Sequence, residues 1–195
     1  VRSFARTGLP FKLGGNENGR GHGERLAVDP HDGRTLFLGT RNDGLWVSRD
    51  RGASFAPVAG FPAAAWATGP APADQRRSSG DGRNGIVFVL FDAGTGSRGK
   101  ACRVVYAGVS ALGRPGLYRS GDGGASWRAV PGQPTACRPN HAVLATDGTL
   151  YLSSGNEPGP ARMADGAVWR LDTASDTWQD ITPERPSEQR PFGYT

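Results

Sequence analysis

The sequence predicts an all-β fold built from repeated four-stranded units, and three observations indicate it. Short apolar runs recur along the whole chain, each bounded by glycine, proline or polar residues. The 195 residues include 30 glycines and 15 prolines, which separate these runs instead of gathering in one tract. An eight-residue pattern occurs twice, and no segment shows a convincing helical periodicity.

The repeated pattern begins at Ser48 and again at Ser120 and has the form Ser-x-Asp-x-Gly-Ala-Ser-aromatic. This is the Asp-box pattern, a turn between two antiparallel strands. Its carboxylate can accept backbone N–H bonds across the turn, its glycine can take a positive φ, and its aromatic residue returns to the core. We therefore assign turn-forming, non-catalytic roles to eight residues: Ser48, Asp50, Gly52, Phe55, Ser120, Asp122, Gly124 and Trp127.

Each Asp-box lies within a set of four short predicted strands, which we interpret as one blade. The first blade covers approximately residues 24–60, with strands at 26–30, 35–40, 44–48 and 55–58. The second covers 85–132, with strands at 85–92, 103–109, 116–120 and 127–130. The alternation of apolar runs and turns is what an antiparallel sheet requires.

A third blade is predicted at 141–183, with strands at 141–145, 149–153, 167–171 and 177–181. Its turn, residues 172–178, resembles a degenerate Asp-box with one extra residue. Residues 184–195 are predicted to begin a further blade.

Tandem four-stranded units predict a β-propeller, in which about 4–8 blades close around an axis. Three blades do not close a ring, so we expect residues 1–195 to be a partial propeller domain. Either other chains or further blades of a longer protein must complete it, and the abrupt ends of the sequence favour the longer protein.

The composition excludes several classes of function. The net charge is +5, but the arginines are scattered and form no basic stripe with interleaved aromatics, so no nucleic-acid partner is expected. No apolar stretch reaches about 18 residues, so no membrane partner is expected. Cys102 and Cys137 could form a disulfide or remain free thiols. Neither they nor the three histidines have metal-site spacing, so we expect no metal and no cofactor.

Two adjoining stretches near the N-terminus carry a family resemblance. Residues 9–16 (LPFKLGGN) and 19–30 (GRGHGERLAVDP) resemble glycoside hydrolase family 74, the xyloglucanases and related endo-β-1,4-glucanases. The resemblance continues through residues 44–46, 118–120, 131–135 and 192–194, so it covers essentially the whole chain.

This resemblance implies a secreted enzyme with two seven-bladed propellers facing each other across a cleft. Its partners would be xyloglucan or a related β-glucan, together with the remaining blades and the second propeller. The implied reaction is hydrolysis of backbone β-1,4 linkages with inversion, which uses two carboxyl groups roughly 6.5–9.5 Å apart.

The resemblance also implies where the catalytic acids lie. The family places one aspartate in a Thr-Asp-x-Gly-Gly-x-Tyr-Arg motif before the matched region, and the other in the second propeller. Neither motif occurs here, and the similar Asp122-Gly123-Gly124 belongs to an Asp-box. We therefore assign no catalytic residue to this segment and expect the isolated chain to be inactive.

Several residues are candidates for sugar contact. Asn16, Arg20 and His22 lie in the glycine-rich stretch 14–25, where hydroxyl recognition competes with a purely structural loop. A phosphate loop is excluded there, because no Lys-Ser/Thr ending follows. Glu24 and Arg25 adjoin the first strand and could contact substrate or form a partly buried ion pair.

Three more candidates lie further along the chain. Trp66, in an irregular connection between blades, could stack on a sugar or pack within its loop. Asn156 belongs to an insertion inside the third blade, at 156–164, that could reach the cleft, and Tyr194 begins a further blade at an edge that could be exposed. Two other functions compete with hydrolysis of glucan. A non-catalytic Asp-box propeller could bind glycan or protein. A sialidase would need an arginine triad and a Tyr–acid pair, which the sequence does not assemble convincingly.

Overall fold

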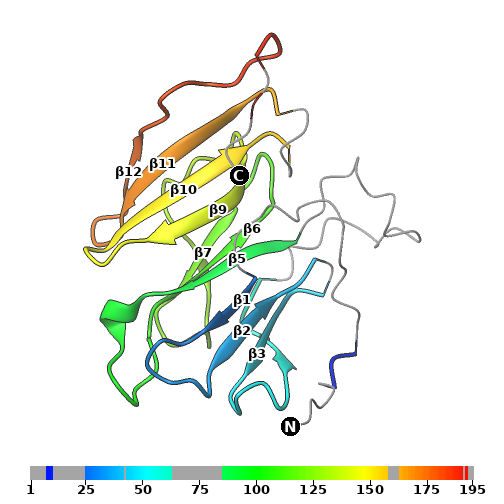
Figure 1. Ribbon diagram of the computed structural model, residues 1–195, viewed down its shortest axis with the longest axis vertical. Coiled ribbons are helices and arrows are strands. Elements are labelled where there is room, and N and C mark those ends of the chain that lie inside the picture. The colour runs from blue at the N-terminus through cyan, green and yellow to red at the C-terminus, as the bar shows by residue number, and fades with distance from the viewer. Residues whose placement is uncertain are drawn as a thin grey trace, which may run out of the picture.

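The computed structural model describes residues 8–10, 25–41, 43–62, 85–157, 163–190 and 192 of the chain. Within these residues the strands form three four-stranded antiparallel sheets, each in simple chain order (Figure 1). The predicted all-β class with three four-stranded antiparallel units is thus confirmed.

The first two sheets each surround one Asp-box turn. The first consists of β1 (Leu26–Val28), β2 (Leu36–Gly39), β3 (Leu45–Ser48) and β4 (Ala56–Pro57). The second consists of β5 (Ile86–Phe91), β6 (Val105–Val109), β7 (Leu117–Ser120) and β8 (Arg128–Ala129), with a short 3₁₀ helix, η2 (Ala93–Thr95), after β5.

The third sheet has longer strands. It consists of β9 (Arg138–Leu144), β10 (Thr149–Gly155), β11 (Gly166–Asp172) and β12 (Thr177–Asp180). β9 begins three residues before the strand expected at 141–145 (138 against 141), because the pairing with β10 continues past an irregularity. Ser153 pairs with His141 but Ser154 pairs with Pro139, so Asn140 is an extra residue in a β-bulge.

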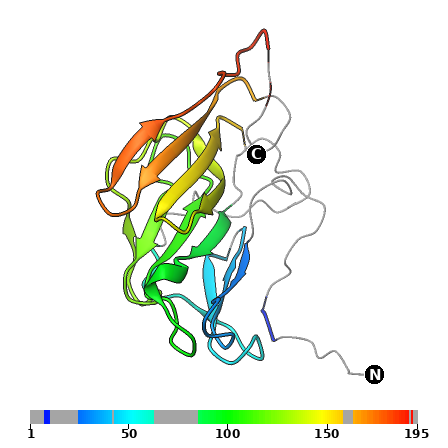
Figure 2. The same cartoon turned by 60° about the vertical axis from the view of Figure 1, so that its left-hand side comes forward.

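The three sheets follow one another in chain order, and their first strands lie together. β5 contacts both β1 and β9, so these three strands form the inner edge of the assembly (Figures 1 and 2). This is the arrangement of neighbouring propeller blades, each packing a sheet face on the next.

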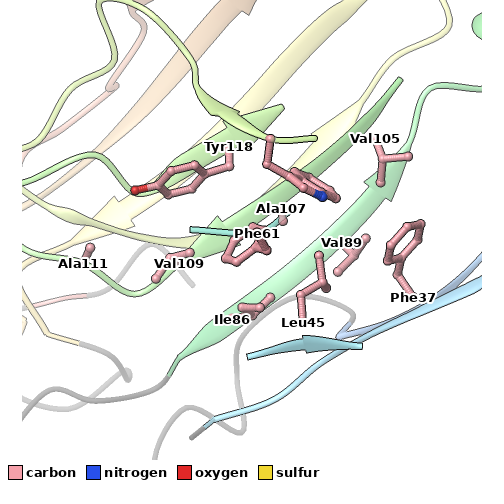
Figure 3. Close-up of a cluster of buried hydrophobic side chains, with 11 residues drawn as sticks. Phe37, Leu45, Phe61, Ile86, Val89, Val105, Ala107, Val109, Ala111 and Tyr118 are labelled. Carbon is pink, nitrogen blue, oxygen red and sulfur yellow. The ribbon is translucent and has the colours of Figure 1, made fainter. Parts of the chain in front are cut away.

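Two apolar cores lie between neighbouring sheets. The first joins Phe37 and Leu45 of the first sheet to residues such as Ile86 and Val89 of the second (Figure 3). The second joins Tyr106 and other residues of the second sheet to the third sheet. Full burial of a Val, Ile, Leu or Phe side chain contributes about 1.5–3 kcal/mol, so each sheet is stabilised chiefly by its neighbours.

The outer faces of the first and third sheets carry exposed apolar side chains. On β1, Leu26 and Val28 are each 51% exposed, and they point away from the second sheet. On the third sheet, Val143 of β9 lies directly opposite Tyr151 of β10, and both side chains are exposed. No described residue covers these two faces.

The two cysteines do not form a disulfide. Both are free and buried. Cys102 precedes β6 and Cys137 precedes β9, and these two strands begin at opposite ends of the sheets. Burial raises the pKa of the Cys102 thiol to about 12 and that of Cys137 to about 11, so neither is a reactive thiolate near neutral pH.

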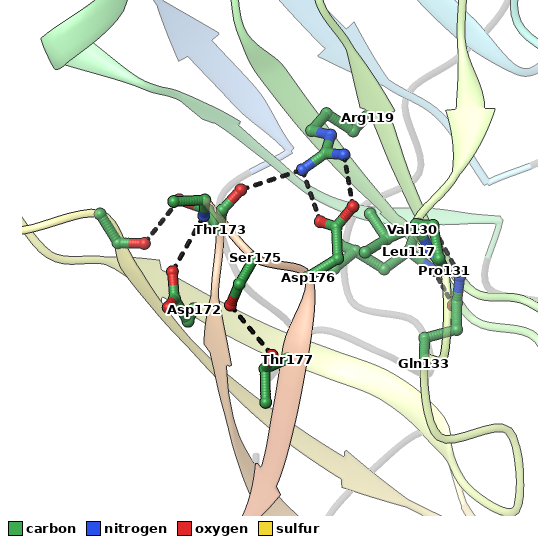
Figure 4. Close-up of polar contacts among 12 residues, drawn as sticks. Leu117, Arg119, Val130, Pro131, Gln133, Asp172, Thr173, Ser175, Asp176 and Thr177 are labelled. Atoms are coloured by element: carbon green, nitrogen blue, oxygen red, sulfur yellow. Dashed lines mark hydrogen bonds and ion pairs between the residues drawn. The ribbon is translucent and has the colours of Figure 1, made fainter.

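The third turn is not a degenerate Asp-box. Asp172 accepts a bond from the nearby backbone N–H of Ala174 instead of bridging the turn. Asp176 has a φ of +56° and directs its carboxylate to Arg119 of the second sheet, at 2.7 and 2.9 Å (Figure 4). This hairpin therefore contacts the neighbouring sheet.

Among the described residues, no helix has the length and apolar character needed to cross a membrane.

Candidate functional site

Each sheet has two ends that differ in what they carry. The Asp-box end carries the turns at 49–55 and 121–127. The opposite end, called here the loop end, carries the starts of β1, β5 and β9 and the ends of β2, β6 and β10. Because the strands alternate in direction, the chain segments that lead into β1 and β5 join the sheets at the loop end.

The sequence candidates for sugar contact divide into two groups. Arg25 and Asn156 are described, and both lie at the loop end, one before β1 and the other after β10. The other six lie outside the described residues: Asn16, Arg20, His22, Glu24, Trp66 and Tyr194. Their proposed contacts with sugar stay predictions.

Asn156 organises the loop between β10 and β11. Its Oδ1 accepts hydrogen bonds from the backbone N–H groups of Ala164 and Asp165, both at 3.1 Å. Its backbone N–H donates to Asp165 O at 3.0 Å. The side-chain oxygen is therefore engaged by the protein. A sugar contact by Asn156 would have to use its amide nitrogen.

Arg138 is a loop-end residue that the sequence reasoning missed. It begins β9 opposite Gly155, is only 8% exposed, and donates from Nε to Asn156 O at 3.2 Å. Burial lowers the pKa of its guanidinium, while the charge of Glu157 opposes that shift. A guanidinium held at the inner edge can donate to sugar hydroxyls. The residue precedes the strand expected at 141–145, and no motif in the sequence marked it as a candidate.

Other buried polar groups share the loop end. Ser110, directly after β6, is 7% exposed, and its hydroxyl has no hydrogen-bond partner in the described structure. Asn140 is fully buried in the β9 bulge, and Ser154 donates to Ala167 O at 3.2 Å. A buried polar group costs free energy unless it has a hydrogen-bond partner, and a water molecule or a ligand can supply one to Ser110.

Gln133 braces the same end of the second sheet. Its Oε1 accepts from the backbone N–H groups of Gly116 and Leu117, both at 2.7 Å, and its Nε2 donates to Leu117 O and Val130 O (Figure 4). Gln133 lies in the 131–135 stretch that carries part of the family resemblance. Its four bonds hold the loop end of β7 against the chain that follows β8.

At the opposite end, the Asp-box carboxylates close their own turns. Asp50 Oδ1 accepts from Ser48 Oγ at 2.8 Å and from Ser54 N at 2.9 Å, and Oδ2 accepts from Ser54 Oγ at 2.5 Å. The bonds from Ser54 and Ser48 lower the pKa of Asp50 to about 2. The glycine of this turn, Gly52, has a φ of +83°.

The second Asp-box repeats this geometry. Asp122 accepts from Ser120 Oγ at 2.8 Å and from the N–H and hydroxyl of Ser126 at 2.9 and 2.6 Å, and these bonds hold its pKa far below the usual range. Trp127 is only 9% exposed and packs in the first core. A carboxylate that remains ionised in this way cannot serve as a general acid near neutral pH.

Within the described part of the chain, no group of three or more His, Cys, Asp or Glu side chains could hold a metal ion.

No protein-family model matches the chain. Curated relatives do match it. A xyloglucanase of a Paenibacillus species is 43% identical to this chain over 194 residues, and the match covers 98% of this chain and 18% of that protein. A xyloglucanase of Acetivibrio thermocellus is 42% identical over 183 residues, 93% of this chain and 21% of that protein. The chain therefore spans about a fifth of the length of these relatives.

A solved structure matches as well. The crystal structure of a GH74 xyloglucanase from Xanthomonas campestris superposes on this chain with a TM-score of 0.86 and 48% sequence identity. The match covers 98% of this chain and 27% of that structure. The two chains are therefore similar in sequence as well as in fold.

Proposed function

The chain corresponds to a segment of an enzyme of glycoside hydrolase family 74, and on that premise we propose that the protein containing it hydrolyses the β-1,4 backbone of xyloglucan. The observation that carries this proposal is the end-to-end match with the Xanthomonas campestris enzyme, at 48% identity over 98% of the chain. We further propose that the protein is secreted, since the proposed substrate is a polymer of the plant cell wall.

The open sheet faces support the presence of further blades in the same protein. Leu26 and Val28 on one side, and Val143 and Tyr151 on the other, are apolar residues at positions where a neighbouring blade would bury them. In the two seams that the structure describes, the equivalent faces are packed into continuous apolar cores. We propose that additional blades cover both outer faces and that a second propeller completes the cleft.

The proposed mechanism is inversion by two carboxyl groups. One protonates the leaving oxygen and the other activates a water molecule on the opposite face of the sugar, at a separation of roughly 6.5–9.5 Å. Asp50 and Asp122 suit neither role. Each is held ionised by its own turn, which excludes the acid, and both of its oxygens accept bonds within that turn, which makes it a weak base. The catalytic pair is therefore proposed to lie outside this segment.

The loop end is the proposed contribution of this segment to substrate binding. Arg138, Asn156 and Ser110 gather polar groups at that end of the sheets. The chain segments that contain Asn16 and Trp66 also join the sheets there. Arginine, amide and hydroxyl groups match the hydroxyls of a neutral glucan.

Hydrolysis of xyloglucan by the whole protein tests this proposal. We expect the whole protein to release oligosaccharides from xyloglucan, and a chain of residues 1–195 alone to release none, since it lacks the proposed catalytic pair. Release by the isolated chain would contradict the placement of that pair. Binding of xyloglucan by the whole protein without cleavage would instead favour a non-catalytic propeller that binds glycan.

A further inference from the structure

The two seams between neighbouring sheets differ at the Asp-box end. The first seam separates the sheets β1–β4 and β5–β8, and the second separates β5–β8 and β9–β12. The strand registers show which residues of the two seams correspond. Phe37 pairs with Val47, the residue before Ser48 of the first Asp-box. Tyr106 pairs with Arg119, the residue before Ser120 of the second Asp-box. Tyr106 therefore has the place in the second seam that Phe37 has in the first.

The first seam is filled at this end. Arg49 follows the Asp-box serine, and its guanidinium lies 5.6 Å from the centre of the Phe37 ring and donates to Gly123 O at 2.8 Å. The second Asp-box turn closes the seam from the other side. A Cβ on Gly124 would lie only 2.3 Å from Phe37, so the turn backbone packs directly on that ring.

The second seam lacks both closing features. Gly121 has the position of Arg49, and a Cβ added to it would meet no atom within 4 Å. The turn that faces this seam is not an Asp-box, and Arg119 of β7 reaches across the seam to it. That side chain donates to Thr173 O at 3.2 Å and to the Asp176 carboxylate at 2.7 and 2.9 Å (Figure 4).

A cavity of about 450 Å³ remains in the second seam. Tyr106, which is 1% exposed, belongs to its apolar inner wall, and Gly121 and Thr173 also line it. Trp127 lines the cavity as well, although its ring packs against Phe37 in the first core. Its size falls within the range of roughly 300–1,000 Å³ of small-molecule sites.

The charged groups that line the cavity balance. Two are cationic, Arg119 and Arg128, and two are anionic, Asp92 and Asp122. Arg119 is already paired with Asp176, so the lining has no net positive charge that would attract a small anion. It does present hydrogen-bond donors and acceptors together.

Some of these groups have bonding capacity to spare. Arg128 is exposed, with five N–H donors on its guanidinium. Asp92 uses Oδ1 to accept from Gly94 N at 2.9 Å, and its other oxygen is not used in that cap. Asp122 Oδ2 accepts from Ser126 Oγ, and a carboxylate oxygen can accept a second bond.

We propose that this cavity binds a neutral pyranose unit. A sugar ring presents several hydroxyls, each both donor and acceptor, which match a balanced set of guanidinium and carboxylate groups against an aromatic wall. This inference goes beyond the proposed function, because the cavity would hold a sugar whether or not the protein cleaves xyloglucan.

The test uses the whole protein and the disaccharide α-D-xylopyranosyl-(1→6)-D-glucose, which contains no β-1,4 linkage. Crystals of the wild type, Gly121→Arg and Gly121→Ala are soaked in it, with sulfate soaks as the charged comparison. Gly121→Arg introduces the residue that fills the first seam, whereas Gly121→Ala adds a methyl group into open space. We expect sugar density in the cavity of the wild type and Gly121→Ala, and none in Gly121→Arg.

A second variant keeps the test decisive if Gly121→Arg does not fold. Arg128→Ala removes an exposed donor, and we expect it to weaken disaccharide binding about tenfold, as one lost charged hydrogen bond would. Binding is followed by the ¹⁹F signal of 5-fluorotryptophan at Trp127, assigned with Trp127→Phe.

An empty cavity in soaked wild-type crystals would overturn the inference. So would sulfate bound in preference to sugar, or unchanged affinity in Arg128→Ala. Hydrolysis of xyloglucan by the wild type is measured separately, so a failure of the proposed function is not confused with a failure of this site.

Discussion

Gly121 and Gly124 belong to the same Asp-box turn but have opposite surroundings. Gly124 has a φ of +93°, and a Cβ there would lie 2.3 Å from the Phe37 ring. Gly121 has free space around the position of its missing Cβ. Phe37 is fully buried in the first core, so it cannot move away from Gly124 without disturbing the packing of both sheets.

Replacing Gly124 by alanine is expected to lower the free energy of unfolding by about 2–4 kcal/mol, from backbone strain together with overpacking against Phe37. Gly121→Ala is the matched control and should change it by less than about 0.5 kcal/mol. Urea unfolding of the whole protein measures both. Equal effects of the two substitutions would contradict the described packing of the turn.

Arg119 and Asp176 form a two-point ion pair between the second and third sheets, and their side chains are 12% and 24% exposed. Arg119→Ala is expected to lower the free energy of unfolding by about 1–3 kcal/mol, since a partly buried carboxylate loses its partner. Arg185→Ala breaks a more exposed pair with Asp180, where the side chains are 52% and 35% exposed, and should cost less than about 1 kcal/mol. Similar losses in the two variants would argue against an ion pair that joins the sheets.

Residue type and position could be predicted more readily than residue contacts. The sequence places Asn156 in an insertion inside the third blade, but its bonds to the Ala164 and Asp165 backbone are visible only in the folded structure. Arg138 was missed for a related reason. Its guanidinium is buried by a strand that begins earlier than the apolar run at 141–145 indicates.

At the scale of elements, the Asp-box turns link local sequence to stability. Asp50 has its pKa lowered from 3.8 to about 2 by hydrogen bonds from Ser54 and Ser48. A depressed carboxylate pKa means that the folded state favours the ionised form, so the stabilisation is fully present above pH 4 and is lost as the pH falls toward 2.

The Asp50→Asn variant tests this linkage. We expect the wild type to have the higher Tm at neutral pH, and the difference to shrink as the pH falls from 4 to 2. Ser54→Ala, which removes a donor to the same carboxylate, should weaken the pH dependence in the same range. A Tm difference that stays constant down to pH 2 would show that Asp50 does not stabilise the turn through its charge.

The third turn shows where element prediction from the sequence ends. Residues 172–178 share an aspartate and an aromatic residue with the Asp-boxes, but Asp176 has a positive φ and its carboxylate leaves the turn. Its partner, Arg119, lies 57 positions earlier in the chain. A local pattern contains no information about such a partner, so the contact between sheets emerges only in the folded structure.

At the scale of the whole molecule, repetition made the architecture predictable. Four-stranded units recur with the same order and register, and each pair of neighbours buries a core, so the sequence pattern and the packing agree. The site was less predictable, because sugar contacts depend on loops whose residues follow no periodic pattern. Trp66 and the glycine-rich stretch 14–25 are identified by composition and resemblance alone.

The anomeric form of the first products tests the proposed reaction most directly. Proton NMR during the initial phase of xyloglucan hydrolysis by the whole protein distinguishes the two anomers of each new reducing end. Attack by water opposite the leaving group converts a β linkage into an α product, so the α anomer should appear first and the β anomer only through mutarotation. Initial formation of the β anomer would show retention and would contradict the inverting mechanism.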